Sequence, residues 1–165
     1  MRLEILKYPD KRLRIVSKEV EEIDGNLQSY IDSLISTMYE MEGCVGIAAP
    51  QTNLHKRLIV IDSSRFRKPP KKPLGLQVLI NPVILEKEGE ILFREGCLSI
   101  PELLATVKRS KRIGIKAYNR EGKEVEFEVK GIEAVLIQHE IDHLDGILFL
   151  DRISSVSDLE LRKKC

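Results

Sequence analysis

The stretch from Ile132 to Gly146, IEAVLIQHEIDHLDG, decides the fold. Its apolar residues and histidines recur at intervals of three and four, which predicts an α-helix that stops near the glycine. Within it, His139-Glu140-Ile141-Asp142-His143 is an H-E-x-x-H sequence. Two histidines four residues apart lie on one face of a helix and can bind one metal ion. Glu140, beside the first histidine, can hold or move the proton of a water on that ion.

A chance match is the alternative interpretation of so short a motif. The helix face that carries the two histidines continues into Ile132, Val135 and Leu136, whereas the face of a solvated helix would be polar. We therefore expect both histidines to be buried and to need a partner.

A catalytic metal usually has a third protein ligand and an open position for water. Position 149, where a metzincin would place a third histidine, is Phe149. Glu160, a candidate for the downstream glutamate of thermolysin-like proteases, lies in a highly charged tail of a chain too short for their architecture. His55 lies in a polar turn that favours a solvated role. Cys97, flanked by glycine and apolar residues, is a plausible soft ligand, although an isolated cysteine is more often a small buried hydrophobe.

The composition fits one soluble domain without an overall charge. The 165 residues are 42% hydrophobic, and 27 basic side chains nearly cancel 26 acidic ones, so no net field favours nucleic acid or a membrane. The start, MRLEILKYPD, has no apolar signal region, and no 18 apolar residues run together. Cys44, Cys97 and Cys165 are odd in number and far apart, which suits a reducing compartment. We expect a cytoplasmic protein.

Secondary-structure signals alternate along the rest of the chain. Helical spacing of apolar residues predicts an amphipathic helix that ends near Gly43. Expected strands are 57–62, 77–80, 83–94 and 105–108, with a hairpin formed by 113–119 and 123–130 and a short helix at 157–164. The basic, proline-rich segment 63–75 is interpreted as a solvated loop, with contact to the ribosome or RNA as the alternative.

These elements predict an α+β fold. Antiparallel β-sheets would pack around a central helix that bears the H-E-x-x-H motif, with an amphipathic N-terminal helix and a short C-terminal helix. We expect residues 1–165 to form a single catalytic domain, with a short tail from about residue 155.

Three ordered motifs resemble those of the peptide deformylase family. The family patterns are G-x-G-hydrophobic-A-A-x-Q, E-G-C-hydrophobic-S and Q-H-E-x-D-H, and they correspond here to Cys44–Gln51, Glu95–Ser99 and Gln138–His143. Cys44 departs from the first pattern, because the family has glycine at that place. The resemblance extends over roughly residues 4–153 and is far more specific than one motif.

The resemblance implies hydrolysis of the formyl group from the N-terminal formylmethionine of newly made proteins, by a metal-bound water that a glutamate activates. The implied metal ligands are Cys97, His139 and His143. Glu140 would be the acid and base, and the Gln51 side chain and the Leu98 amide would polarise the formyl oxygen. The expected substrate-binding residues are Gly46, Ile47, Glu95, Gly96, Ile132, Val135 and Leu136.

The same resemblance implies one divalent ion per chain. Ferrous iron is typical of the family, with zinc, nickel or cobalt as substitutes. The expected partners are nascent N-formylmethionyl polypeptides, with transient ribosome contact and neither membrane nor specific nucleic-acid binding. Two alternatives stay open from the residues themselves: a small zinc peptidase that cuts internal peptide bonds, and a structural Cys-His-His site closed by a fourth protein ligand.

Overall fold

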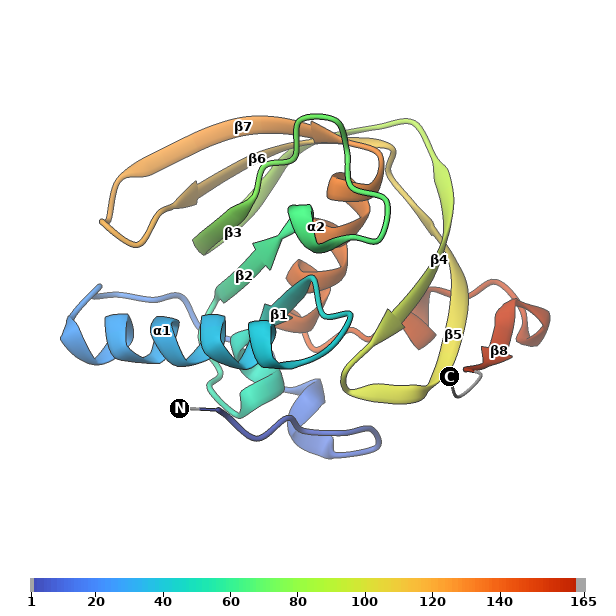
Figure 1. Cartoon of the computed structure of the whole chain (residues 1–165), viewed down its shortest axis with the longest axis horizontal. Coiled ribbons are helices and arrows are strands. Elements are labelled where there is room, and N and C mark those ends of the chain that lie inside the picture. Colours follow the sequence, from blue (N-terminus) through green and yellow to red (C-terminus); the bar gives the residue numbers. More distant parts are fainter. Residues whose placement is uncertain (1, 163–165) are drawn as a thin grey trace.

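A computed structural model describes residues 2–162, within which two α-helices and eight strands form an α+β fold (Figure 1). The helices are α1 (Gly25–Glu40) and α2 (Ile132–Leu144). The strands are β1 (Gly46–Ala48), β2 (Leu58–Asp62), β3 (Leu76–Glu88), β4 (Ile91–Cys97), β5 (Ile100–Arg109), β6 (Arg112–Tyr118), β7 (Glu124–Lys130) and β8 (Leu159–Leu161). They form two antiparallel sheets, one in the order β1-β2-β3-β6-β7 and one in the order β4-β5-β8.

The five-stranded sheet carries one helix on each face. Side chains alternate across a strand, so Ile59 and Ile61 of β2 pack in the core with α2, whereas Leu58 and Val60 pack in the core with α1. All five residues of β2 are consequently buried. The expected strand at 57–62 and the expected N-terminal helix are both confirmed; Asp24 caps that helix by accepting a hydrogen bond from the Leu27 N–H at 2.9 Å.

Helix α2 lies in the middle of the molecule, between the two sheets (Figure 1). Every residue from Glu133 to Leu144 is buried, which includes polar side chains on the faces away from the histidines. Glu133 and Gln138 have partners: Glu133 accepts from Ser63 Oγ, and Gln138 exchanges hydrogen bonds with the backbone of Ser110. The central helix is therefore held by its polar groups as well as its apolar stripe.

Two expectations for the strands and the tail were wrong. Segment 83–94 is not one strand, because the chain turns at Gly89 (φ +70°) and passes from β3 into β4 of the other sheet. The expected helix at 157–164 is not formed by residues 157–162: a short 3₁₀ turn ends at Asp158, and β8 then pairs with β5. The segment pairs as β8 although its local sequence favours a helix, because the edge of β5 offers unpaired backbone N–H and C=O groups for hydrogen bonds. Residues 163 and 164 lie outside the described part.

A third apolar cluster joins the three-stranded sheet to the end of α2. Cys97, Ile100 and Val107 of β4 and β5 pack with Leu148 and Phe149, which follow the helix. This packing brings the end of β4 against the helix that carries both histidines. Among the described helices, none is both long enough and apolar enough to cross a membrane.

Candidate metal centre

The three predicted ligands meet in the buried space between β4 and α2. Cys97, at the end of β4, and His139 and His143, on α2, place their ligand atoms within 4.8 Å of one another. Cys97 Sγ lies 3.4 Å from His143 Nε2. The two imidazole rings are edge to face, with centroids 5.1 Å apart, as expected for histidines one helical turn apart.

The orientation of His139 is fixed by Glu95. Glu95 Oε1 lies 2.7 Å from His139 Nδ1, which leaves Nε2 of that ring toward the cluster. Burial disfavours the imidazolium of His139, but hydrogen bonds to Cys97 and Glu95 outweigh it and raise the pKa. For His143, burial and the charge of His139 lower the pKa.

Glu95 is itself held by a buried arginine. Arg109 donates from Nε to Glu95 Oε2 at 2.8 Å and from Nη2 to Oε1 at 2.9 Å, and both side chains are at least 96% buried. Burial raises the pKa of Glu95, but the hydrogen bonds from Arg109 and His139 outweigh burial and lower it to about 2. Glu95, which the family resemblance implied as a substrate-binding residue, thus contacts His139, one of the three predicted ligands.

Gln51 is oriented by the backbone of its own motif. It lies in the short 3₁₀ helix Ala49–Thr52 after β1, and its Oε1 accepts from the Ala48 N–H at 2.9 Å. Its Nε2 consequently faces the cluster and donates to Cys97 Sγ at 3.4 Å and Ser99 Oγ at 3.1 Å. The buried amide is therefore a fixed donor beside the ligands.

Glu140 has an unpartnered oxygen in a dry environment. The residue is 4% exposed, and among the described residues its Oε1 has no hydrogen-bond partner. Burial is the main cause that raises its pKa to about 7. A buried polar atom without a protein partner indicates that a water or substrate belongs there. A carboxyl that titrates near neutrality is suited to accept and return a proton.

Strand β1 passes close over Glu140 because Gly46 has no side chain. A Cβ at this glycine would lie 2.8 Å from Glu140 Oε2 and 2.9 Å from Leu136 Cδ1. Ile47 points into the core and is fully buried, so its backbone is what it can offer to a ligand. The position of Cys44, which departs from the family pattern, is buried, and its thiol donates to the Gly46 carbonyl at 3.3 Å.

The remaining predicted residues lie around this cluster. Leu98 and Ser99 form the two-residue turn between β4 and β5, and Gly96 is the exposed residue before Cys97. Val135 is 3% exposed and Leu136 6%, one to two helical turns before the histidines, while Ile132 begins the helix half-buried.

The competing ligands stay outside the cluster. Phe149 packs against the His139 ring, with centroids 6.1 Å apart. Glu160 pairs with Arg94 on the exposed side of the three-stranded sheet. His55 Nε2 lies 2.9 Å from the Arg12 carbonyl. Within residues 2–162, the group that could hold an ion therefore has three ligands, as in a catalytic site rather than a closed structural one.

Comparison with known proteins decides the family. Residues 2–158 match the family described as "Polypeptide deformylase". The chain belongs to this family. A peptide deformylase of Thermodesulfovibrio yellowstonii is 49% identical over 162 residues, which cover 98% of this chain and 95% of that protein. The crystal structure of a peptide deformylase from Legionella pneumophila has a TM-score of 0.86 and 41% identity, and covers 96% of this chain and 89% of that one.

A second solved structure is that of a class I type b peptide deformylase from Acinetobacter baumannii, described as Met-Ala-Ser bound. It has a TM-score of 0.87 and 34% identity, and the match covers 93% of this chain and 99% of that one. As a peptide deformylase, the chain is a metal-dependent hydrolase that removes the formyl group from the N-terminus of nascent polypeptides. The family resemblance of the three motifs and the α+β fold are thus confirmed.

Sequence reasoning missed Arg109. It lies fourteen residues after Glu95 at the end of β5, where a basic residue on a strand next to Ser110 gives no signal of burial. It also did not assign a role to Asp142, the fourth letter of the H-E-x-x-H stretch, which accepts from Arg109 Nη1 at 2.5 Å.

Proposed function

We propose that Cys97, His139 and His143 hold one divalent ion per chain and that Glu140 transfers the protons of formyl hydrolysis. The observation that carries this proposal is the buried cluster of one sulfur and two nitrogens beside the unpartnered Oε1 of Glu140. When bound, the ion supplies Lewis acidity, which polarises a carbonyl and acidifies water. The mixed sulfur and nitrogen donors fit a first-row divalent metal. Family resemblance supports ferrous iron in the cell, with zinc, nickel or cobalt as substitutes.

Glu140 is the base and then the acid in this proposal. Its carboxylate takes the proton of the attacking water and returns it to the amine that leaves, so that one residue serves both halves of the reaction. Its raised pKa brings the two protonation states within reach of each other near neutral pH. A structural role would not call for a buried carboxylate oxygen that lacks a partner.

The developing negative charge on the formyl oxygen would meet two donors. Gln51 Nε2 is already oriented toward the cluster by the Ala48 N–H, and the Leu98 N–H lies in the tight turn that follows Cys97. Donors that are fixed before the reaction stabilise an oxyanion without reorganising. Both would therefore contribute to the chemical step rather than to initial binding.

The peptide would bind as an added strand at β1. This strand pairs with β2 on one side and is the edge of its sheet, so that the backbone of Gly46 and Ile47 can pair with an extended peptide. β4, with Glu95 and Gly96 near its end, is likewise the edge of the three-stranded sheet. We assign Ile132, Val135 and Leu136 to the wall of the methionine pocket, because they precede His139 on α2. The Met-Ala-Ser peptide described for the Acinetobacter baumannii enzyme begins with this residue.

The cellular setting is part of the proposal. The substrate is a nascent chain, which supports action in the cytoplasm near the ribosome. The loop 63–75 supplies exposed basic side chains, including Lys68, Lys71 and Lys72, for a transient ribosome contact. Co-sedimentation with purified ribosomes, with and without charge reversal of these lysines, tests this contact.

The deciding experiment is an anaerobic assay with ferrous iron or nickel supplied. It compares formyl-Met-Ala-Ser with acetyl-Met-Ala-Ser and unmodified Met-Ala-Ser, and uses Glu140→Gln as the matched variant. We expect formate from the formyl peptide, far slower release of acetate, and no internal cleavage. The metal-loaded Glu140→Gln variant should turn over roughly 100- to 10,000-fold more slowly. Near-wild-type turnover by that variant would refute the proton-transfer role, and internal cleavage would favour a peptidase.

A further inference from the structure

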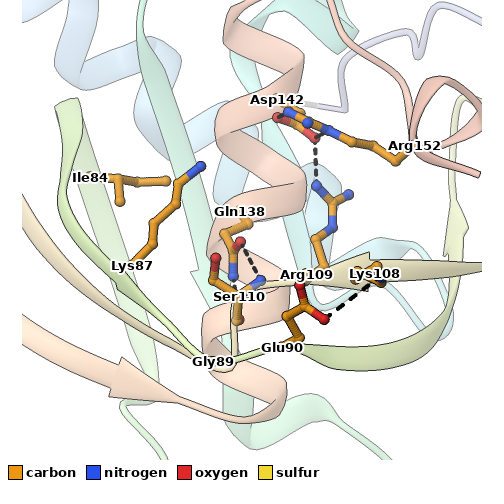
Figure 2. A pocket seen from close by; sticks show the side chains of 10 residues that line it. All are labelled: Ile84, Lys87, Gly89, Glu90, Lys108, Arg109, Ser110, Gln138, Asp142 and Arg152. Carbon is orange, nitrogen blue, oxygen red and sulfur yellow. Dashed lines mark hydrogen bonds and ion pairs between the residues drawn. The ribbon is translucent and has the colours of Figure 1, made fainter.

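An unbroken series of paired charges runs from the protein surface to the metal-ligand histidine. Arg152, in the 3₁₀ helix Phe149–Arg152, donates from Nη2 to Asp142 Oδ1 at 2.8 Å and from Nε to Oδ2 at 3.0 Å. Asp142 Oδ2 also accepts from Arg109 Nη1 at 2.5 Å. The remaining nitrogens of Arg109 hold both oxygens of Glu95, whose Oε1 contacts His139 Nδ1. Figure 2 shows Asp142 between the two arginines.

We propose that Arg152 is a positioning residue of the metal centre, acting through Asp142 and Arg109 on the carboxylate that orients His139. Arg152 binds Asp142 through two hydrogen bonds, and Arg109 binds Glu95 in the same way, so each of these two links fixes the plane of the carboxylate as well as its distance. The series joins four segments of the chain, namely β4, the end of β5, helix α2 and the 3₁₀ helix after α2. This inference rests on the three-ligand site of the proposed function.

The inner members of the series are buried, whereas Arg152 at its outer end is partly exposed. The side chains of Arg109 and Glu95 are 3% and 4% exposed, and that of Asp142 is 10% exposed, whereas that of Arg152 is 42% exposed. A buried charge that loses a partner must find another or reorient. Without Arg152, Asp142 would be held by Arg109 alone, and the Arg109 fork would be free to shift away from Glu95. Arg152 is thus the exposed member of the series, and its replacement still leaves Asp142 paired with Arg109.

The space around the outer link permits this test. Arg152, Asp142 and Arg109 line a polar pocket of about 250 Å³ on the side of α2 shown in Figure 2, together with Gln138, Lys108 and Glu90. A shorter side chain at position 152 would leave room for water there rather than a steric conflict. Loss of Arg152 should therefore perturb the orientation of Asp142 more than the packing of the core.

Removal of Arg152 has opposite expected effects on ion affinity, depending on whether its charge or its positioning role dominates. Glu95 and Asp142 carry two negative charges, and Arg109 and Arg152 carry two positive ones. Removal of Arg152 leaves this group net negative, which by long-range attraction alone would strengthen the binding of a cation. A positioning role predicts weaker binding, because the ring of His139 is less firmly held.

The experiment measures ion affinity rather than turnover. The affinity of Arg152→Gln and Arg152→Lys for Co²⁺ is determined by competition with a chelator, together with the visible spectrum of the cobalt form and the melting temperature. We expect both variants to bind Co²⁺ about 3- to 10-fold more weakly, at or below the low end of the effect of replacing a group that directly orients a ligand. Lysine keeps the charge but not the fork, so it should resemble glutamine rather than the wild type.

Arg14→Gln is the matched control. Arg14 pairs with Asp151, next in sequence to Arg152, and its side chain is 43% exposed, but the pair has no link to the ligands. This control should leave the Co²⁺ affinity and spectrum unchanged, even where the melting temperature falls by as much as in the Arg152 variants. Equal effects of Arg14→Gln and Arg152→Gln on affinity would reduce Arg152 to a general structural role.

The Asp142→Asn background tests the route. If Arg152 acts through Asp142, Arg152→Gln should have little further effect on affinity in this background, so that the two substitutions are not additive. Unchanged or tighter Co²⁺ binding by Arg152→Gln overturns the inference, as does full additivity with Asp142→Asn. Failure of the wild type to bind Co²⁺ through sulfur and nitrogen would instead overturn the proposed function, and this inference with it.

Discussion

Oε1 of Glu95 lies 2.7 Å from Nδ1 of His139, and the same carboxylate accepts hydrogen bonds from Nε and Nη2 of Arg109. β4 therefore contributes two residues to the candidate site. Cys97 is a candidate ligand, and Glu95, two residues earlier, contacts a histidine of α2. Glu95 and Cys97 are both buried whereas Gly96 between them is exposed, so the two side chains lie on the same face of β4.

Glu95→Gln tests this relationship. The amide keeps the size of the side chain but loses the charge that Arg109 and His139 share. We expect metal affinity to fall roughly 10- to 100-fold, as for other groups that orient a ligand histidine. Chelator competition measures this directly. Unaltered affinity would show that the helix alone orients His139.

Gly46→Ala should impair catalysis through contact with Glu140. The added Cβ would lie 2.8 Å from Glu140 Oε2 and 2.9 Å from Leu136 Cδ1, so β1 or the carboxylate must move. A misplacement of about 1 Å at a reacting group costs about 100-fold in rate, so we expect kcat/KM to fall by about this factor. Gly25→Ala is the control, since nothing lies within 4 Å of its Cβ position at the start of α1. Steady-state kinetics on both variants that shows equal rates would contradict the close approach.

Gln51→Leu should lower kcat and leave metal binding in place. Its Nε2 donates to Cys97 Sγ at 3.4 Å, and loss of one oxyanion donor costs on the order of 100-fold or more in turnover. Kinetics and metal content are measured on the same preparation. A normal kcat would place the donor elsewhere, and loss of the ion would give Gln51 a role in holding Cys97.

The raised pKa of Glu140 predicts a pH dependence of stability in the metal-free protein. The folded pKa of about 7 exceeds the ordinary value of 4.5, so the folded state binds the extra proton. The stabilising contribution of this group is therefore fully present below pH 4.5 and is lost as the pH rises through 7. The free energy lost is on the order of 3 kcal/mol, at about 1.4 kcal/mol per pKa unit.

Glu140→Gln removes this titration and is the comparison. Urea unfolding of both metal-free proteins at several pH values should give a gap in favour of the variant that widens between pH 4.5 and 7 and is constant above it. A gap that does not change over this interval would show that burial does not raise the pKa of this carboxyl above 4.5 in the folded protein.

Local signals in the sequence were strong wherever one element carried the whole pattern. The helical spacing from Ile132 to His143 predicted both α2 and the pair of histidines on one of its faces, because the helical period is set by backbone geometry alone. The hairpin of β6 and β7 was predicted from alternating residues on either side of a turn at Asn119 and Gly122, which is also a local signal. These features depend on residues close together in the chain.

The wrong predictions concern segments whose structure depends on pairing with residues far away in the chain. The chain changes sheets at Gly89, and the tail pairs with β5 through Leu159 and Leu161, neither of which a local pattern records. The amphipathic stripe of α2 likewise gave no hint that Gln138 and Asp142, on its other faces, are also buried. Their partners, Ser110 and Arg109, come from the adjoining β5 strand and its end.

The sequence by itself determined the family and the helix that carries two candidate ligands, because these follow from residue chemistry and from spacing within one element. Only the tertiary structure decided that Cys97 reaches the two histidines, that Glu95 contacts one of them, and that Arg109 and Arg152 pair with the buried carboxylates beside it. The physical reason is that a buried charge is tolerated only where other charges, from segments far away in the chain, surround and pair with it.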